Sequence, residues 1–433
     1  MMEKTIWTEE LRRYLALNKD IETEVLVIGG GICGILCAYR LAKSGKRVVL
    51  VEAERIGSER TRKTTAVITA LQDALYSKLK KKIGTDNTRL FLEANLEAVE
   101  EYKKMAWEYD FDFEEVSSYK YATKDKKILL KELDVLSELG YSARFVDALA
   151  YPFAIEGAIE FPKQGQMNPM KLIQNLIPFF EIYEDTRIRD IRNTTAFTEK
   201  HKIQAQHIIV ATGYPFLKFR GFYFTKLIQN KSYVAVIPRD TGDEQGNAIG
   251  LDPADLYFRS YKDYLIIGGN DQKTGRYRQG FFPLLQYISK YYPDKEVQYL
   301  WVNQDCVSLD EMPYIGRYAK KNVYVATGFN LWGMTGSMLA SMVLADRICG
   351  KENRYEKLFS PKRKMLPLPL LANLGGAIAG MLQPTVKRCG HLGCGLFWNE
   401  KEKVYECSCH GSKYDKSGKL LFNPAQRDKA YKK

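Results

Sequence analysis

Neither a cleavable leader nor a bilayer-spanning run is visible in the sequence. The opening residues, MMEKTIWTEELRRYLALNKD, carry charges throughout and have no continuous apolar core, which excludes a signal peptide. Met365–Val386 has no charged residue, but Pro367, Pro369 and Pro384 leave only about Leu370–Leu382 free to be helical. A transmembrane helix needs roughly 20 residues, so this helix is too short to span a bilayer. We expect a cytoplasmic protein whose scattered cysteines stay reduced.

Low-complexity tracts and nucleic-acid motifs are also missing, although the net charge is +13. From Lys351 to the C-terminus there are 17 Lys and Arg against 7 Asp and Glu, so +10 of the excess lies there. We therefore predict no nucleic-acid partner and assign the basic end to solubility or to docking of an acidic protein. A second interpretation is peripheral membrane contact through residues 365–386, whose basic flanks suit an anionic interface.

A nucleotide-binding signature opens the folded part of the chain. In TEVLVIGGGICG, Val25–Ile28 suits a buried parallel strand, and Gly29, Gly31 and Gly34 form G-x-G-x-x-G. Ile35, Ala38 and Leu41 give the following helix an apolar face before Gly45 ends it. RVVLVE is a second strand, and Glu52 at its end is placed to accept a ribose hydroxyl hydrogen bond.

Two later stretches return to the same pattern. HIIVATGYP, residues 207–215, and NVYVATGFNLWGMTGS, residues 322–337, each end an apolar run in Ala-Thr-Gly, and the second then opens a helix. A single βαβ unit that binds one half of a dinucleotide does not require further strands of this kind so far along the chain. Together with GSERTRKTTAVIT at 57–69 and LDEMPYIG at 309–316, they resemble the FAD-binding fold of the D-amino-acid-oxidase/glycine-oxidase (DAO) family.

The resemblance implies an FAD-dependent oxidoreductase that removes two electrons from a C–N bond of an amine or amino acid. It implies the following flavin contacts: Gly29, Gly31, Gly34, Glu52, Thr64, Thr65, Ala211, Thr212, Gly213, Gly328, Gly333, Met334 and Thr335. Cys306 lies near the point where some relatives attach FAD covalently, but its register differs by about three residues, so we expect non-covalent FAD.

Two residues are candidates for substrate binding. Tyr257 and Arg259 alternate along LYFRSY, so on a strand they share one face, which the resemblance directs toward the flavin. Arg259 is suited to clamp a carboxylate and Tyr257 to add a hydroxyl. The alternative is an arginine that pairs with a structural acid or carbonyl. Trp332, next to the flavin loop, is interpreted as a pocket wall or as packing.

The last tenth of the chain concentrates metal-ligand chemistry. CGHLGC at 389–394 and CSCHGS at 407–412 hold four of the eight cysteines and two of the four histidines. Each arm mixes one Cys with one His, whereas zinc fingers pair cysteines in one arm and histidines in the other. Two thiolates and two imidazoles suit a [2Fe–2S] cluster with two Cys on one iron and two His on the other.

The two arms resemble the Rieske motifs C-x-H-x-G-C and C-x-C-H-G-S. The resemblance implies Cys389, His391, Cys407 and His410 as cluster ligands, a disulfide between Cys394 and Cys409, and hydrogen bonds from Ser412 and Tyr414 to cluster sulfur. Asn423–Gln426, NPAQ, resembles the proline loop that covers the cluster. The domain is abbreviated, so we expect the cluster to lean on the FAD domain or the linker helix.

The predicted fold is α/β plus β. A discontinuous Rossmann-like FAD-binding domain (20–100, 150–222 and 306–355) is interleaved with an antiparallel substrate domain (101–149 and 223–305). A helical linker (356–384) leads to a short Rieske-type β domain (385–433).

The predicted function is an amine or amino-acid dehydrogenase that passes electrons through the Rieske centre to an external acceptor. Two alternatives stay open: an electron-transfer module reduced by a partner protein, and an oxidase with a non-functional Rieske domain.

Overall fold

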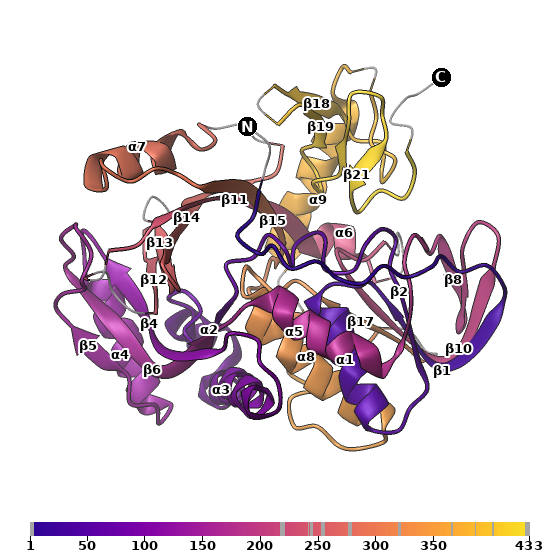
Figure 1. The fold of residues 1–433 in the computed structure, drawn as a ribbon, viewed down its shortest axis with the longest axis horizontal. Helices are drawn as coiled ribbons and strands as arrows, with labels where there is room; N and C mark the ends of the chain where they lie inside the picture. Colours follow the sequence, from indigo (N-terminus) through magenta and orange to yellow (C-terminus); the bar gives the residue numbers. More distant parts are fainter. Residues whose placement is uncertain are drawn as a thin grey trace.

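A computed structural model describes residues 4–216, 221–240, 242, 246–252, 256–275, 279–318, 322–364, 367–385, 387–400 and 402–428. Figure 1 shows two large sheets side by side and a small C-terminal β module above them. This arrangement confirms the predicted fold class: one chain forms an α/β part, a second sheet and a short β module.

The first sheet has eight strands, with the main order β16-β17-β10-β1-β2-β7. Its centre is parallel: β1 (Ile21–Ile28) pairs with β2 (Val48–Val51) and with β10 (Lys202–Gly213), and β10 pairs with β17 (Val323–Thr327). Three predicted strands therefore end in glycine-rich turns at one edge of the sheet, where ligands bind in open α/β sheets. The remaining strands are β7 (Glu181–Tyr183), β8 (Asp190–Arg192), β9 (Thr195–Phe197) and β16 (Tyr314–Arg317).

Helix α1 (Ile32–Lys43) follows β1 and covers this sheet together with α8 (Gly333–Ile348). The predicted apolar face is confirmed, because Ile35, Ala38 and Leu41 are all fully buried. Burying one such aliphatic side chain contributes roughly 1.5–3 kcal/mol, so this face fixes the helix against the strands.

The second sheet has nine strands in the main order β15-β11-β14-β13-β12-β4-β6-β3, with β5 on β6. Two of them, β3 (Val67–Ile68) and β6 (Gly157–Gln166), fall in segments that the sequence interpretation gave to the FAD domain. β12 and β4 pair in parallel, so the sheet is not antiparallel throughout. The others are β4 (Glu114–Ala122), β5 (Arg144–Val146), β11 (Leu227–Pro238), β12 (Asn247–Gly250), β13 (Tyr257–Tyr261), β14 (Tyr264–Lys273) and β15 (Tyr299–Ser308).

Helices α2 (Tyr76–Ile83), α3 (Thr85–Glu108), α4 (Lys127–Glu138) and α5 (Pro169–Leu176) contribute buried residues to the main hydrophobic core. Helices α6 (Tyr223–Lys226) and α7 (Phe282–Tyr291) instead pack in two smaller clusters.

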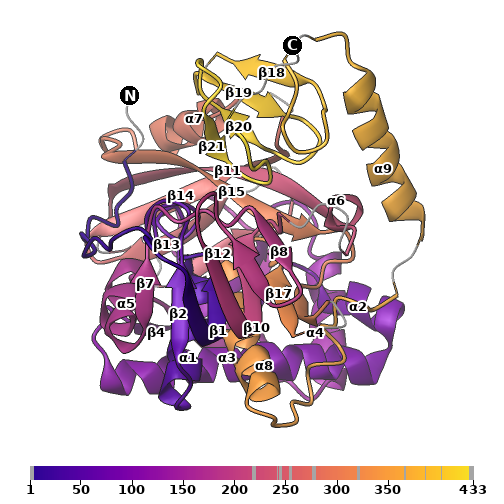
Figure 2. The same ribbon diagram turned by 90° about the vertical axis from the view of Figure 1, so that its right-hand side faces the viewer.

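The C-terminal module is a four-stranded antiparallel sheet, β18 (Leu396–Asn399), β19 (Val404–Cys407), β20 (Lys413–Tyr414) and β21 (Leu420–Phe422). It sits above β11 and β15, and the linker helix α9 (Pro367–Leu382) stands along one side of the molecule (Figure 2). The helix starts three residues earlier than predicted, because proline is tolerated in a first helical turn. None of the helices in the described ranges is long and apolar enough to cross a membrane.

Candidate functional site

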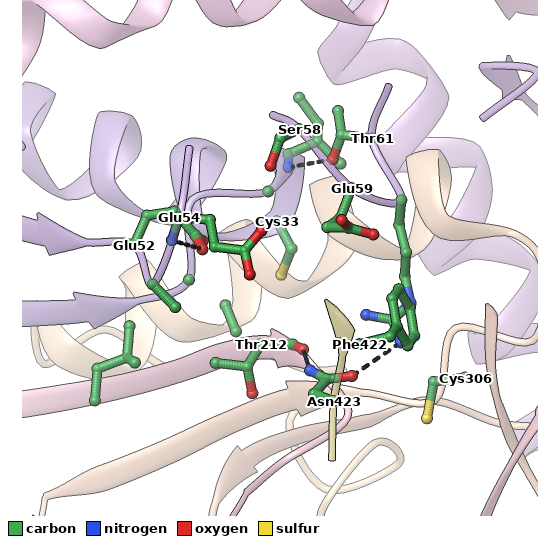
Figure 3. A pocket seen from close by; sticks show the side chains of 18 of the residues that line it. Cys33, Glu52, Glu54, Ser58, Glu59, Thr61, Thr212, Cys306, Phe422 and Asn423 are labelled. Carbon is green, nitrogen blue, oxygen red and sulfur yellow. Dashed lines mark hydrogen bonds between the residues drawn. The ribbon is translucent and has the colours of Figure 1, made fainter. Parts of the chain in front are cut away.

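A deep cleft opens at the glycine-rich edge of the first sheet (Figure 3). The space between atoms in this cleft, open solvent included, is about 1430 Å³. Most of the predicted flavin contacts line it: Gly29, Gly31, Glu52, Thr64, Ala211, Thr212, Gly213, Gly328, Gly333 and Met334.

The glycines are required by close backbone approaches. Gly29 has φ +113°, and a Cβ there would lie 2.6 Å from the Ala211 carbonyl oxygen. A Cβ on Gly34 would lie 1.9 Å from the Gly29 carbonyl oxygen, so Gly34 lets α1 pack against the turn and does not itself line the cleft. Both positions shape the turn at which a pyrophosphate would meet the start of α1.

Glu52 terminates β2 with its carboxylate turned into the cleft (Figure 3). It accepts hydrogen bonds from the backbone N–H groups of Gly30 (2.7 Å) and Glu54 (3.0 Å). Burial raises the pKa of Glu52, and these N–H groups oppose that rise. The two bonds hold the carboxylate at the place predicted for the ribose.

Two further predicted flavin residues lie behind the wall of the cleft. The Thr335 hydroxyl donates to the Thr69 carbonyl and accepts from the Thr69 N–H, each at 3.0 Å, which ties α8 to the segment before α2. The Thr65 carbonyl accepts a hydrogen bond from Arg259. Their side-chain and backbone bonds support the cleft from outside.

Arg259 is fully buried between the two sheets. Its guanidinium donates to the carbonyls of Thr65 and Met167 and to the side-chain oxygen of Gln166, so each of its three nitrogens already has a protein acceptor. It also lies 5.2 Å from the Trp7 ring centroid, and burial lowers its pKa to about 9. This geometry matches the alternative stated for Arg259, an arginine that pairs with structural carbonyls.

Tyr257 shares the face of β13 with Arg259, and its ring lies over Gly268 of the neighbouring strand β14. Burial, with Asp271 and Asp305 nearby, raises the pKa of its phenol well above the ordinary value, while Ser232 hydrogen-bonds to it. Trp332 directly precedes α8 and is half-buried. Neither belongs to the cleft lining.

The four predicted cluster ligands come together in the C-terminal module, and all are buried. The Tyr414 hydroxyl lies 3.7 Å from Cys389 Sγ and accepts from the Gly390 N–H at 2.8 Å, while the His391 N–H donates to Cys389 Sγ at 3.4 Å. Such donors stabilise thiolate sulfur. The Ser412 hydroxyl accepts from the Ala425 N–H at 3.1 Å, which anchors the predicted proline loop.

Cys394 and Cys409 adjoin the ligands but are free thiols in this structure, as are all eight cysteines. Their sulfurs and that of Cys407 lie within 4.8 Å of one another. Both contact the Ala377 carbonyl of α9, and a Cβ on Gly380 would lie 2.3 Å from Cys409 Sγ. The disulfide stays a prediction, and α9 covers the pair.

The histidine edge of the module faces the rest of the protein. The ring centroids of His391 and His410 lie 4.9 Å apart, and the Tyr214 ring is 6.0 Å from each. His410 Nε2 lies 2.9 Å from the Phe224 carbonyl oxygen, which makes Nε2 the protonated nitrogen of a neutral ring. Tyr214 directly follows Gly213, which lines the cleft, and its buried ring packs beside both imidazoles.

The module also forms part of the cleft itself. Phe422 and Asn423 line it (Figure 3). Asn423 donates to the Thr212 carbonyl at 2.7 Å and accepts from Arg60 at 3.3 Å, while Arg60 lies 4.5 Å from the Phe422 ring centroid. The sequence interpretation assigned NPAQ only to covering the cluster and did not identify Arg60, although both lie in segments it singled out.

Ion pairs fasten the module to β11. The Lys231 ammonium, on a side chain 3% exposed, pairs with Glu402 at 2.7 Å and also with Glu406. Lys413 pairs with Glu402 at 2.9 Å. Burial would raise the pKa of Glu402, but Lys413 and Lys231 outweigh it and lower the pKa to about 2. The contribution of Glu402 is therefore present above its ordinary pKa and lost only as the pH falls through about 2.

Lys231→Met is expected to loosen the module, because it leaves two buried carboxylates beside one lysine. Breaking a buried pair costs about 3–5 kcal/mol. Limited trypsin digestion of the holoenzyme should release the C-terminal fragment at least ten-fold faster. Lys403→Met, which removes an exposed pair with Glu400 on the same module, is the matched control. Equal digestion rates for the two variants would contradict the role of Lys231.

The residues present fit both predicted cofactors. The glycine turn, the helix start and Glu52 suit a dinucleotide. In the module, His410 Nδ1 is buried with no hydrogen-bond partner in the described part of the chain, which suits coordination to a metal. Two thiols and two imidazoles in one buried cluster match the donor set of a Rieske centre.

Comparison with known proteins agrees over both parts. The family profile described as FAD dependent oxidoreductase (DAO) matches residues 24–347, and the profile described as Rieske [2Fe-2S] domain matches residues 375–432. The putative Rieske 2Fe-2S iron-sulfur protein YhfW of Bacillus subtilis is 28% identical over 98% of this chain and 96% of its own. Gamma-glutamylputrescine oxidoreductase of Escherichia coli is 23% identical over 78% of this chain and 87% of its own.

Among solved structures, glycine oxidase from Geobacillus kaustophilus superposes with a TM-score of 0.67 at 19% identity. The match covers 80% of this chain and 100% of that one. At this identity the likeness concerns the fold alone.

Proposed function

We propose, from the premise that the chain belongs to the FAD-dependent oxidoreductase (DAO) family and carries a C-terminal Rieske domain, that it is an amine or amino-acid dehydrogenase. It binds FAD and a [2Fe–2S] cluster. In the proposed reaction the carbon next to nitrogen loses a hydride and the nitrogen loses a proton, so that two electrons and two protons leave in all and the C–N bond becomes C=N. The electrons leave through the cluster to an external acceptor.

FAD, when bound, supplies the two-electron acceptor for the C–H bond next to nitrogen. The chain holds it through the glycine turn and Glu52, and the substrate must present a neutral amine. The second sheet faces the same cleft through Asp305 of β15, so this sheet supplies the groups that orient the substrate.

The observation that carries the proposal is the shared wall between the cleft and the cluster loops. Asn423 lines the cleft and follows β21, while Tyr214 follows the cleft wall and packs on both predicted histidine ligands. A Rieske module with only a structural or regulatory role would not need its histidine ligands to face the FAD cleft. This supports a relay over an oxidase with an idle Rieske domain.

Anaerobic spectroscopy of the holoenzyme tests the proposal. Primary amines, secondary amines and D- and L-amino acids are added in turn, and flavin absorbance and the cluster EPR signal are followed. We expect at least one class to bleach the flavin and then to generate the reduced-cluster signal. A flavin that no compound bleaches would favour a module reduced by a partner protein. Bleaching without a cluster signal would favour the oxidase.

Helix α9 has the features of a contact surface for an anionic membrane, where the proposed electron acceptor would lie. Its buried side is Asn373, Ala377 and Gly380, whereas its solvent side is apolar throughout, with Leu371 62% and Leu382 79% exposed. Exposed Lys362 and Lys364 precede the helix, and Lys387 and Arg388 follow it. An apolar face between basic flanks is typical of interfacial helices.

Leu371→Glu combined with Leu382→Glu is expected to abolish this contact. Wild-type holoenzyme should sediment with phosphatidylglycerol vesicles but not with phosphatidylcholine vesicles, and the double variant should bind at least ten-fold more weakly. Trp107→Glu, at a position 87% exposed on α3, is the matched control. Wild-type protein that stays in the supernatant with both vesicles would rule the contact out.

A further inference from the structure

Carboxylates gather on the face of the second sheet that looks into the flavin cleft. Asp305 on β15 lines the cleft, Asp271 lies on β14, and Asp73 lies just before α2. Asp271 and Asp73 are exposed and Asp305 is half-buried. Burial, together with Asp73 and Asp305, nevertheless raises the pKa of Asp271 to about 7. Asp305 thus reaches the cleft, while Asp271, outside the cleft lining, lies close enough for the charge of Asp305 to act on it; we call this corner of the sheet the recess.

The cationic side chains near this recess, those of Lys120 and Arg60, already have other partners. The Lys120 ammonium pairs with Asp73 at 3.0 Å. The Arg60 guanidinium donates to the Gln304 carbonyl and to the Gln229 side chain, both at 2.8 Å. Neither Asp271 nor Asp305 forms an ion pair with any residue that the structure describes. Burial raises the pKa of Asp305 to about 6, although Arg60 opposes the rise.

A separate observation marks the recess as a binding site for an N–H donor. Asn303 is 8% exposed and donates from Nδ2 to the Asp305 carboxylate at 2.7 Å. Its side-chain oxygen Oδ1 is buried and has no hydrogen-bond partner in the described ranges. A buried acceptor without a donor costs about 1–3 kcal/mol. A ligand that brings several N–H groups would satisfy Oδ1 and both carboxylates together.

We propose that this recess, formed by Asp271, Asp305 and Asn303, binds the non-reacting ammonium group of a diamine or polyamine substrate. The inference rests on the proposed oxidation of a C–N bond and specifies its substrate class. The reacting amine must be neutral, so a cation in the recess has to be a second nitrogen of the same molecule. Two adjacent carboxylates would repel the carboxylate of an amino acid, whereas they attract an ammonium.

The test compares 1,4-diaminobutane with 1-aminobutane on anaerobic holoenzyme by flavin bleaching. Both compounds are also titrated calorimetrically into holoenzyme reduced with dithionite, in which no substrate is consumed. We expect the diamine to bind at least ten-fold more tightly in both assays. Asp271→Asn and Asp305→Asn should each reduce that preference at least five-fold. Asp86→Asn, an exposed position on α3, is the matched control. Flavin content is measured for every variant.

The outcomes separate this inference from the proposed function. Equal affinity for diamine and monoamine in the wild type, or an unchanged preference in both Asn variants at full flavin content, would overturn the recess as an ammonium site. Bleaching by amino acids or monoamines under those conditions would leave the dehydrogenase proposal intact. Conversely, calorimetry could show tighter binding of the diamine although no compound bleaches the flavin. That result would support the ammonium site and contradict the proposed reaction.

Discussion

Cys407→Ala is expected to abolish the cluster while leaving the flavin in place. Cys407 ends β19 and is 1% exposed, and the disulfide predicted between its neighbours Cys394 and Cys409 would leave neither of their sulfurs free to replace its thiolate. Iron and acid-labile sulfide should fall to background, and the EPR signal generated by substrate should vanish. Flavin content and the initial anaerobic bleaching should remain within about two-fold of wild type, because the cleft is built mainly by the first sheet.

Cys349→Ala is the control for this variant, since Cys349 follows α8 and lies outside the module. It should keep iron, sulfide, flavin and both spectral signals. Retention of a Rieske signal in Cys407→Ala would contradict the assigned ligand. Loss of flavin together with iron would instead mean that the module is needed to form the cleft.

Gly34→Ala is expected to have the second largest effect, on FAD binding and on folding. Its Cβ would lie 1.9 Å from Gly29 O and 3.1 Å from Gly29 C, both backbone atoms, and 3.3 Å from the Val27 side chain. Neither the turn nor α1 can yield, because both are buried in the core. We expect a loss of about 3 kcal/mol or more in the free energy of unfolding, and FAD occupancy below a tenth. Urea unfolding and the flavin-to-protein absorbance ratio measure the two effects.

Gly375→Ala on α9 is the matched control for a glycine inside a helix. A Cβ there meets nothing within 4 Å, so alanine should be neutral or stabilise by up to about 1 kcal/mol. Full FAD occupancy in Gly34→Ala would contradict the packing argument for the third glycine of the motif.

Sequence reasoning succeeded where a local pattern determines the geometry. The turn after β1 needs glycine at Gly29 and Gly34 whatever the rest of the chain does, and the apolar period of α1 fixes its buried face. The Cys–His spacings likewise bring their side chains together within two adjoining loops. Such features depend on neighbours close along the chain.

It failed where the contact partner is distant in sequence. Nothing near Lys231 announces Glu402 and Glu406, which lie more than 170 residues later. From the sequence, Tyr214 is only a residue that follows a turn. Its packing against the histidines is seen in the structure alone. The strand pattern correctly places Tyr257 and Arg259 on one face of β13. It does not reveal the hydrogen-bond acceptors of Arg259, which come from loops around Thr65 and Met167.

The helical linker has a kinetic consequence. Because α9 joins the module to the flavoprotein within one chain, redocking after an opening event is unimolecular. Short tethers give local concentrations on the order of millimolar, which dilution does not change. Two separate proteins with the same contacts would lose their encounter rate as they are diluted. In the proposed relay the flavin and the cluster therefore stay together at any protein concentration, and only the proposed step to an external acceptor depends on diffusion.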